Sequence, residues 1–181
     1  MSLKHLFAVP AMAISAAAWA GNAAPMGLEL GIATVGQVQK EIGGKARLED
    51  GGTNKFSGGR MLKGDGEGLG IEGLSEIVFV FDAGDRLAGV VMTLPKGPFN
   101  DNFRRVMAML DGKYRVAAKR VPSVGDSYAK YRQGDSVVEL DAPHLSFEMS
   151  LRYLTDRLLS DFEKKSAAEK IEKRRRQASQ F

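Results

Sequence analysis

Four groups of residues have types and spacings that are compatible with ligand binding or catalysis. The first is the segment 68–73, GLGIEG, which satisfies the GxGxxG pattern of a dinucleotide-binding loop. Such a loop needs a strand before it and a helix N-terminus after it, because that helix end holds the pyrophosphate. A strand-forming run follows here instead. The pattern therefore predicts a flexible loop or a bulged strand edge over 51–73, which is rich in glycine.

The second group is the acidic set Asp65, Glu67 and Glu72 in the same glycine-rich segment. Oxygen ligands in glycine-rich loops can bind calcium, but an EF-hand loop needs ligands at several alternating positions and a closing Glu. The segment has too few of them, so we interpret these residues as solvated acids and expect no cofactor.

The third group is Asp141, His144 and Ser146, whose types match a hydrolytic triad. The side chains of a triad must meet around a cleft, and three residues within a stretch of six could do so only in a strained geometry. The alternative is a turn in which Asp141 bonds the backbone and Pro143 fixes the corner. We favour the turn and assign no catalytic residue. The chain has two histidines and no cysteine, so a histidine or thiolate metal site is not expected either.

The fourth group is the basic run near the C-terminus, Lys173, Arg174, Arg175 and Arg176. Cations at a helix C-terminus meet the negative end of its dipole, which is sufficient to explain them. The functional alternative is contact with anionic lipid or another envelope polyanion.

The first twenty residues have the three-part layout of a secretory signal peptide. A short positive start precedes an uncharged apolar run, and Ala18 and Ala20 form a small-x-small cleavage site. The apolar run is shorter than the roughly 20 residues that a spanning helix needs. We therefore expect cleavage after Ala20, export to the periplasm, and no integral membrane segment.

Charge is distributed unevenly along the chain. Residues 21–153 hold 17 basic and 17 acidic side chains, whereas residues 154–181 hold 8 and 5. The pI near 9.3 therefore describes a basic tail and not a basic domain. A neutral body with a periplasmic address argues against nucleic acid as a partner.

A regular framework must position these groups, and hydrophobic periodicity predicts it. A capping box from Thr34 to Gln37 and apolar residues at helical spacing predict a helix over 28–44. Strong β formers around a turn-forming cluster predict a hairpin over 76–95. The remaining predicted elements are a helix over 99–112, strands over 114–121, 127–132, 136–141 and 145–152, and a final helix over 155–177.

Two halves of the sequence are alike. The segment that begins at Val38 matches the one that begins at Val106, at a constant offset of 68. The hairpin residues that begin at Ile77 match those that begin at Val137, at an offset near 60. This alternation predicts an α+β fold of two tandem helix-plus-antiparallel-sheet repeats with a C-terminal helix. The predicted parts are the signal peptide 1–20, a first repeat over 21–95, a second over 96–153, and a basic helix over 154–181.

The predicted strands differ in exposure. In the segment 77–81 the odd-numbered and the even-numbered residues are all apolar, which predicts a strand covered on both faces. In 145–152 apolar Leu145 and Phe147 alternate with polar residues, which predicts one wet face. The residues that we expect to contact a partner from wet strand faces are Tyr128, Lys130, Arg132, Glu148 and Arg152.

The spacing of Thr34, Val38, Ile42 and Gly43, preceded by Gly31, resembles the opening of the small lipoprotein of the outer-membrane β-barrel assembly machine. It is also similar to the repeats of β-lactamase inhibitor protein. The resemblance implies helix-plus-sheet units used singly or in tandem as binding surfaces without catalysis. It covers one helix start, and this chain departs from it: one extra residue lies between Gly31 and Thr34, no Pro follows Gly43, and there is no lipid-bearing Cys.

The mature chain also resembles an uncharacterised family of proteobacterial periplasmic proteins that have the same FSGG and DAPHLSFEM segments. That resemblance implies a family and not an activity. We therefore expect a non-catalytic periplasmic module that binds an envelope protein or an anionic envelope component. The alternatives are a cell-envelope hydrolase, which would need paired carboxylates with perturbed pKa values in a cleft, and a carrier of a small apolar ligand, which would need a dry cavity.

Overall fold

The computed structural model describes residues 21–178, so the predicted cleavage site at Ala18 and Ala20 lies outside the described residues. Within them the chain forms two 3-10 turns, three α-helices and eight strands. In chain order these are η1 (Pro25–Gly27), α1 (Val35–Ile42), β1 (Leu48–Thr53), β2 (Gly58–Asp65), β3 (Glu76–Asp82), β4 (Leu87–Pro95), η2 (Pro98–Asn100), α2 (Asp101–Asp111), β5 (Arg115–Arg120), β6 (Ser127–Gln133), β7 (Ser136–Ala142), β8 (Glu148–Thr155) and α3 (Asp156–Ala178).

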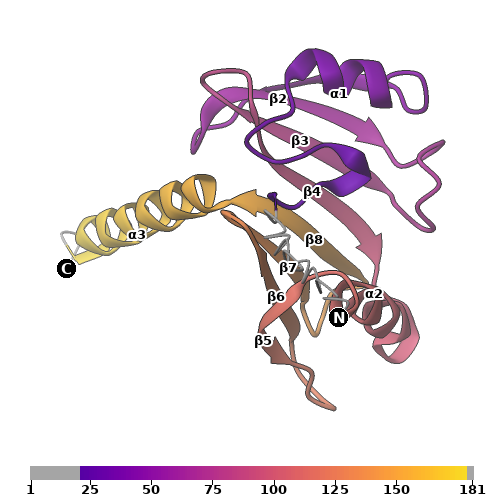
Figure 1. The fold of residues 1–181 in the computed structure, drawn as a ribbon. Helices are drawn as coiled ribbons and strands as arrows, with labels where there is room; N and C mark the ends of the chain where they lie inside the picture. The colour runs from indigo at the N-terminus through magenta and orange to yellow at the C-terminus, as the bar shows by residue number, and fades with distance from the viewer. Residues whose placement is uncertain (1–20, 179–181) are drawn as a thin grey trace, which may run out of the picture.

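The eight strands form one antiparallel sheet in the order β1-β2-β3-β4-β8-β7-β6-β5. The strands that follow α1 make one half and the strands that follow α2 make the other (Figure 1). The halves meet where β4 pairs with β8, and β1 and β5 are the two edges. The predicted α+β class is confirmed, with all eight strands in a single sheet.

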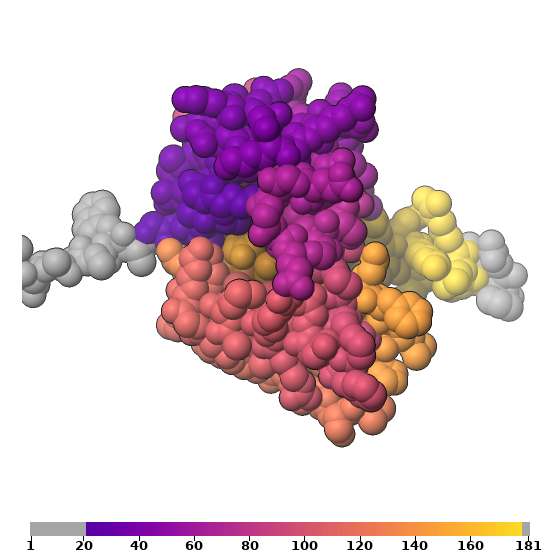
Figure 2. All heavy atoms as spheres, turned by 90° about the vertical axis from the view of Figure 1, so that its right-hand side faces the viewer, coloured from indigo at the N-terminus to yellow at the C-terminus, as the bar shows by residue number. Residues whose placement is uncertain are grey.

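One face of the sheet is covered by α1 and α2, while α3 lies on the opposite face (Figures 1 and 2). The predicted capping box begins α1: Gln37 N donates to Thr34 Oγ1 at 3.3 Å, and Thr34 N donates to Gln37 Oε1 at 2.8 Å. The helix is shorter than predicted, because the stretch from 28 to 34 folds as turns that bond to the β3–β4 hairpin. Among these bonds, Gly31 N donates to Leu87 O at 2.8 Å.

The strand β3 is covered on both faces, as predicted from the apolar residues at its odd-numbered and even-numbered positions. Ile77, Phe79 and Phe81 are fully buried towards α1 and α2. On the other face Val80 is buried in a second cluster with Leu158 of α3. The start of α3 therefore supplies the second cover, by burying apolar side chains that would otherwise face water.

Of the two alternatives predicted for 51–73, the bulged strand edge applies to 51–53 and 58–65, which belong to β1 and β2, and the remaining residues form turns and loops. Glycine weakens the pattern by which a strand is recognised in a sequence, but it also permits a bulge and a close backbone approach. The register between β2 and β3 shifts between Gly58 and Met61. A Cβ on Gly59 would lie 2.2 Å from Phe81 O, so this close approach requires glycine.

The predicted last strand begins three residues too early. β8 starts at Glu148, and Leu145 and Phe147 stay outside it with 93% and 92% of their surface exposed. The cause is a turn, in which Ser146 N donates to Pro143 O at 3.2 Å. The apolar alternation at 145–147 therefore does not mark a buried face.

The helix α3 follows β8 directly and packs first through Leu158 and then through Phe162, whose ring centroid lies 4.9 Å from that of Phe56. Beyond Phe162 the helix still touches the β1–β2 turn: Lys165 donates to Lys55 O, and Lys55 Nζ lies 2.7 Å from Glu169 Oε1. No helix within residues 21–178 combines the length and apolar character that crossing a membrane requires.

Candidate binding face

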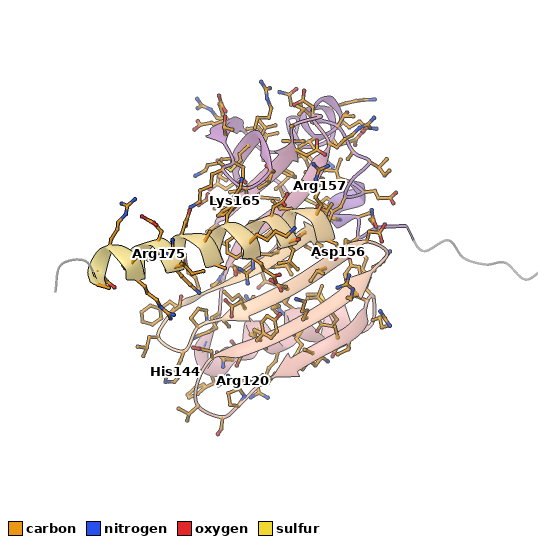
Figure 3. All side chains as sticks on the ribbon, turned by 90° about the vertical axis from the view of Figure 1, so that its left-hand side faces the viewer. Arg120, His144, Asp156, Arg157, Lys165 and Arg175 are labelled. Atoms are coloured by element: carbon orange, nitrogen blue, oxygen red, sulfur yellow. The ribbon has the colours of Figure 1, made fainter. Side chains whose placement is uncertain are left out.

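The side of β6, β7 and β8 that faces away from α1 and α2 presents polar side chains. Strand alternation places every second residue there, and the pairing of Lys130 with Glu139 and of Glu139 with Arg152 sets them in one row. Figure 3 views the sheet from this side, with α3 crossing in front of it. We call this surface the polar face; its residues are Tyr128, Lys130, Arg132, Glu139, Asp141, Glu148, Ser150 and Arg152.

Glu139 is the centre of the polar face. Its carboxylate accepts from Tyr128 Oη at 3.1 Å, lies 3.1 Å from Lys130 Nζ, and lies 3.4 Å from Arg152 Nη2. Only 8% of the residue is exposed, so the charge is withdrawn from water and depends on these three partners. The network fixes the rotamers of a tyrosine, a lysine and an arginine on the same face of the sheet as α3 (Figure 3).

The network also changes the chemistry of its tyrosine. Burial, followed by the nearby carboxylate of Glu139, raises the pKa of Tyr128 to about 12. The phenol is therefore neutral at physiological pH and serves as a hydrogen-bond donor. It has the character of an anchoring side chain, with an apolar body and a polar tip.

Arg132 joins the polar face to α3. Its Nη2 lies 2.5 Å from Asp156 Oδ2, at the first residue of the helix. Arg152 is nearer the middle of the sheet and also lies 3.9 Å from Asp141 Oδ2. Its Nε is buried and has no hydrogen-bond partner among the residues that the structure describes.

The structure brings four of the five predicted contact residues together and leaves the fifth at the margin. Tyr128, Lys130 and Arg152 share Glu139, and Arg132 lies one position further along β6. Glu148 is exposed at the start of β8, opposite Pro95, and no described residue forms an ion pair with it. The sequence analysis did not single out Glu139, although its alternation with the apolar Val138 and Leu140 in a predicted strand was a usable signal.

The basic run is separate from the polar face. Lys173, Arg174, Arg175 and Arg176 are exposed near the end of α3, where Arg176 Nε lies 3.0 Å from Glu172 Oε1 within the helix. Figure 3 places Arg175 far along the helix from Asp156. The predicted anionic-surface contact is therefore a second, independent surface.

The other motifs do not assemble into sites. The segment 68–73 is a turn between β2 and β3, so no helix N-terminus follows it. Glu72 lies 2.5 Å from Arg105 Nη1, and no group of three or more acidic or histidine side chains within residues 21–178 could hold a metal.

Asp141, His144 and Ser146 match a triad in type only, and we favoured a turn for them. His144 Nδ1 accepts from Gly125 N at 3.3 Å, and His144 N donates to Asp126 Oδ1 at 2.7 Å. Ser146 Oγ accepts from Glu148 N at 2.9 Å. These contacts give His144 and Ser146 positions in the structure of the loops and not around a cleft.

Comparisons of the chain with models of known protein families, with curated proteins and with solved structures find no match.

Proposed function

We propose that this chain is a non-catalytic periplasmic interaction module, built from two tandem helix-plus-sheet units, that binds an envelope protein through its polar face. The observation that carries the proposal is the Glu139 network. A nearly buried carboxylate holds Tyr128, Lys130 and Arg152 on the sheet face that α1 and α2 do not cover, beside α3 (Figure 3). Tyrosine and arginine are enriched among the residues that dominate binding energy at interfaces.

Preorganisation supports this reading. Fixing a long side chain when a complex forms costs about 0.5–1.5 kcal/mol, so a surface that is already ordered by internal ion pairs loses less on binding. The polar face carries cations at Lys130, Arg132 and Arg152 and carboxylates at Asp141 and Glu148. Such a mixed pattern fits a protein surface of complementary pattern better than a polyanion, because a polyanion would meet the carboxylates as well.

The topology supports the tandem part of the proposal. Each half of the chain runs from a 3-10 turn through a helix into four strands, and the last strands of the two halves pair with each other. Both 3-10 turns begin with a proline, and the next residue, Met26 or Phe99, has the same φ of 53°. This shared backbone irregularity adds to the sequence match at an offset of 68. The periplasmic address is proposed from the signal-like first twenty residues alone.

In-cell photo-crosslinking tests the proposed surface. A benzoylphenylalanine placed at Ser150 or at Glu148 would probe the polar face, and the same group at Gln39, exposed on α1 across the sheet, is the matched control. We expect both face positions to capture the same protein, identified by mass spectrometry, and the control position not to capture it.

A second experiment uses the captured partner in purified form. Lys130→Glu should weaken its binding at least tenfold, while Gln39→Glu should leave it unchanged. Equal capture from Gln39, or binding that ignores the Lys130 substitution, would place the interaction elsewhere and overturn the proposal.

A further inference from the structure

Four large apolar side chains stand out of the loops at one end of the sheet. Phe99 lies in η2, Val124 in the β5–β6 loop, and Leu145 and Phe147 in the β7–β8 loop. Their exposed fractions are 98%, 73%, 93% and 92%. Because each is exposed to this degree, they do not shield one another. We call Phe99, Val124, Leu145 and Phe147 the apolar loop cluster.

The three loops are tied into one platform. Lys96 N donates to Phe147 O at 2.8 Å, and Lys96 Nζ donates to the carbonyls of Pro143 and His144 at 2.9 and 3.0 Å. His144 extends the platform to the β5–β6 loop, through its bonds with Gly125 N and the carboxylate of Asp126. Figure 3 shows His144 and Arg120 at the same end of the sheet, and in Figure 2 the orange 143–147 loop stands out beside the pink start of α2.

The backbone at Phe99 is strained. Phe99 and Asn100 have φ values of 53° and 61°, in the left-handed region that a bulky side chain adopts only at a cost in free energy. Met26 has the same φ at the equivalent place in the first half, but its side chain packs against the core. The core contact compensates for the strain at Met26, whereas nothing in the described part of the chain does so at Phe99.

We propose that the apolar loop cluster is the interface of a homodimer, in which two copies of this chain bury these side chains against each other. Aromatic side chains bury about 150–250 Å² each, so four phenylalanines from two copies remove about 600–1,000 Å² from water. Leu145 and Val124 add to that area. The total reaches the lower end of the range for specific interfaces, about 1,200 Å².

The charges around the cluster fit a second copy. A two-fold interface brings the same patch together twice, so it must be self-complementary and carry both signs of charge. The three loops and the adjoining strand ends carry Arg120 and Lys96 together with Asp101, Asp126 and Glu148. These carboxylates disfavour the main alternative, insertion of the loops into an anionic bilayer, because a negative surface attracts basic segments and repels acids.

Sedimentation equilibrium of the protein purified from cells that express the whole chain tests the homodimer. We expect a concentration-dependent dimer, whose dissociation constant rises at least tenfold in Phe147→Ser and in Phe99→Asn. Asn accepts the left-handed backbone, so Phe99→Asn removes the ring without adding strain. The matched control is Ile32→Ser, which removes an apolar side chain that is 57% exposed in the first half; its dimer should be unchanged.

The outcomes that overturn the homodimer are distinct from those that overturn the function of the polar face. A monomer at all concentrations up to about 100 µM, a hundredfold above the micromolar affinity that small interfaces commonly reach, contradicts it. A dimer insensitive to both phenylalanine substitutions contradicts it too. Co-sedimentation with phosphatidylglycerol–phosphatidylcholine vesicles that is lost in Phe147→Ser would assign the cluster to a bilayer instead. None of these results involves Ser150, Lys130 or the captured partner.

Discussion

Lys130 Nζ lies 3.1 Å from Glu139 Oε1, and the two residues are direct cross-strand partners in β6 and β7. Their side chains are 26% and 10% exposed, so the pair is shielded from water far more than an ordinary surface ion pair. Arg152 approaches the same carboxylate from the other side, from β8. The polar face therefore depends on one carboxylate that balances two cations.

Replacing that carboxylate should be costly. Glu139→Ala leaves Lys130 and Arg152 partly buried without their counter-charge, and we expect a loss of about 2–4 kcal/mol in the free energy of unfolding. Glu49→Ala is the control, because the Glu49–Arg47 pair is exposed and should change stability by about 0.5 kcal/mol or less. Urea unfolding at neutral pH measures both, and equal losses would mean that the network does not stabilise the fold.

Tyr128 gives the same network a pH signature. Its pKa is 10.0 in an ordinary environment and about 12 in the folded chain, because of burial first and then the carboxylates of Glu139 and Asp141, with Arg152 opposing them. The folded state holds the proton more tightly, so this group stabilises the fold fully below pH 10. The contribution disappears as the pH rises from 10 to 12.

The measurement is the pH dependence of urea unfolding in the wild-type protein and in Tyr128→Phe. We expect the variant to lose less stability than the wild type between pH 10 and 12. Burial raises the pKa values of Tyr131 and Tyr153 as well, so a residual slope should remain. Identical slopes in the two proteins would show that Tyr128 titrates alike in the folded and unfolded chains.

The equivalent strained positions, Met26 and Phe99, should respond in opposite ways to one substitution. Phe99→Asn places a residue that accepts positive φ where an exposed ring stood, and we expect about 0.5–1 kcal/mol of added stability. Met26→Asn relieves the same strain but removes a side chain packed on the core, and should cost about 1–2 kcal/mol. Thermal melts at low protein concentration, where no dimer contributes, decide between them.

The features that could be predicted from the sequence are those set by residues close to one another in it. Thr34 and Gln37 are three residues apart, so the capping box was visible in the sequence and is present in the structure. The apolar residues at both odd-numbered and even-numbered positions of β3 likewise predicted burial on both faces, and the structure confirms this. These features depend on neighbours in the sequence, or on a periodicity within one element.

The features that sequence reading missed depend on distant partners. β2 was hidden by its glycines, because the reason for Gly59 is the carbonyl of Phe81 on the next strand. Phe147 was assigned to a buried face because its alternation matched, but the pairing that would have continued the strand stops at Glu148. Glu139 gained its importance from cations on the two strands that flank it, and only the strand order brings those together.

The last prediction separates the two parts of α3. Phe162→Ala removes the edge-to-face contact with Phe56, and since Phe162 is 43% exposed we expect a loss of about 1–2 kcal/mol, below the cost at a fully buried aromatic. Among the contacts that residues 165–178 make with the body, removal of 165–181 deletes the exposed ones of Lys165 and of Glu169 with the β1–β2 turn. It should cost about 1 kcal/mol or less.

The same truncation tests the basic run. Full-length protein should co-sediment with phosphatidylglycerol vesicles at low salt and less at high salt, because exposed charges are screened. The truncated protein should bind weakly at both. Binding by the full-length protein that ignores salt, or a truncated protein that binds equally well, would mean that Lys173 to Arg176 only complement the negative end of the helix dipole. A large drop in the melting temperature on truncation would instead make the contacts of Lys165 and Glu169 part of the stability of the fold.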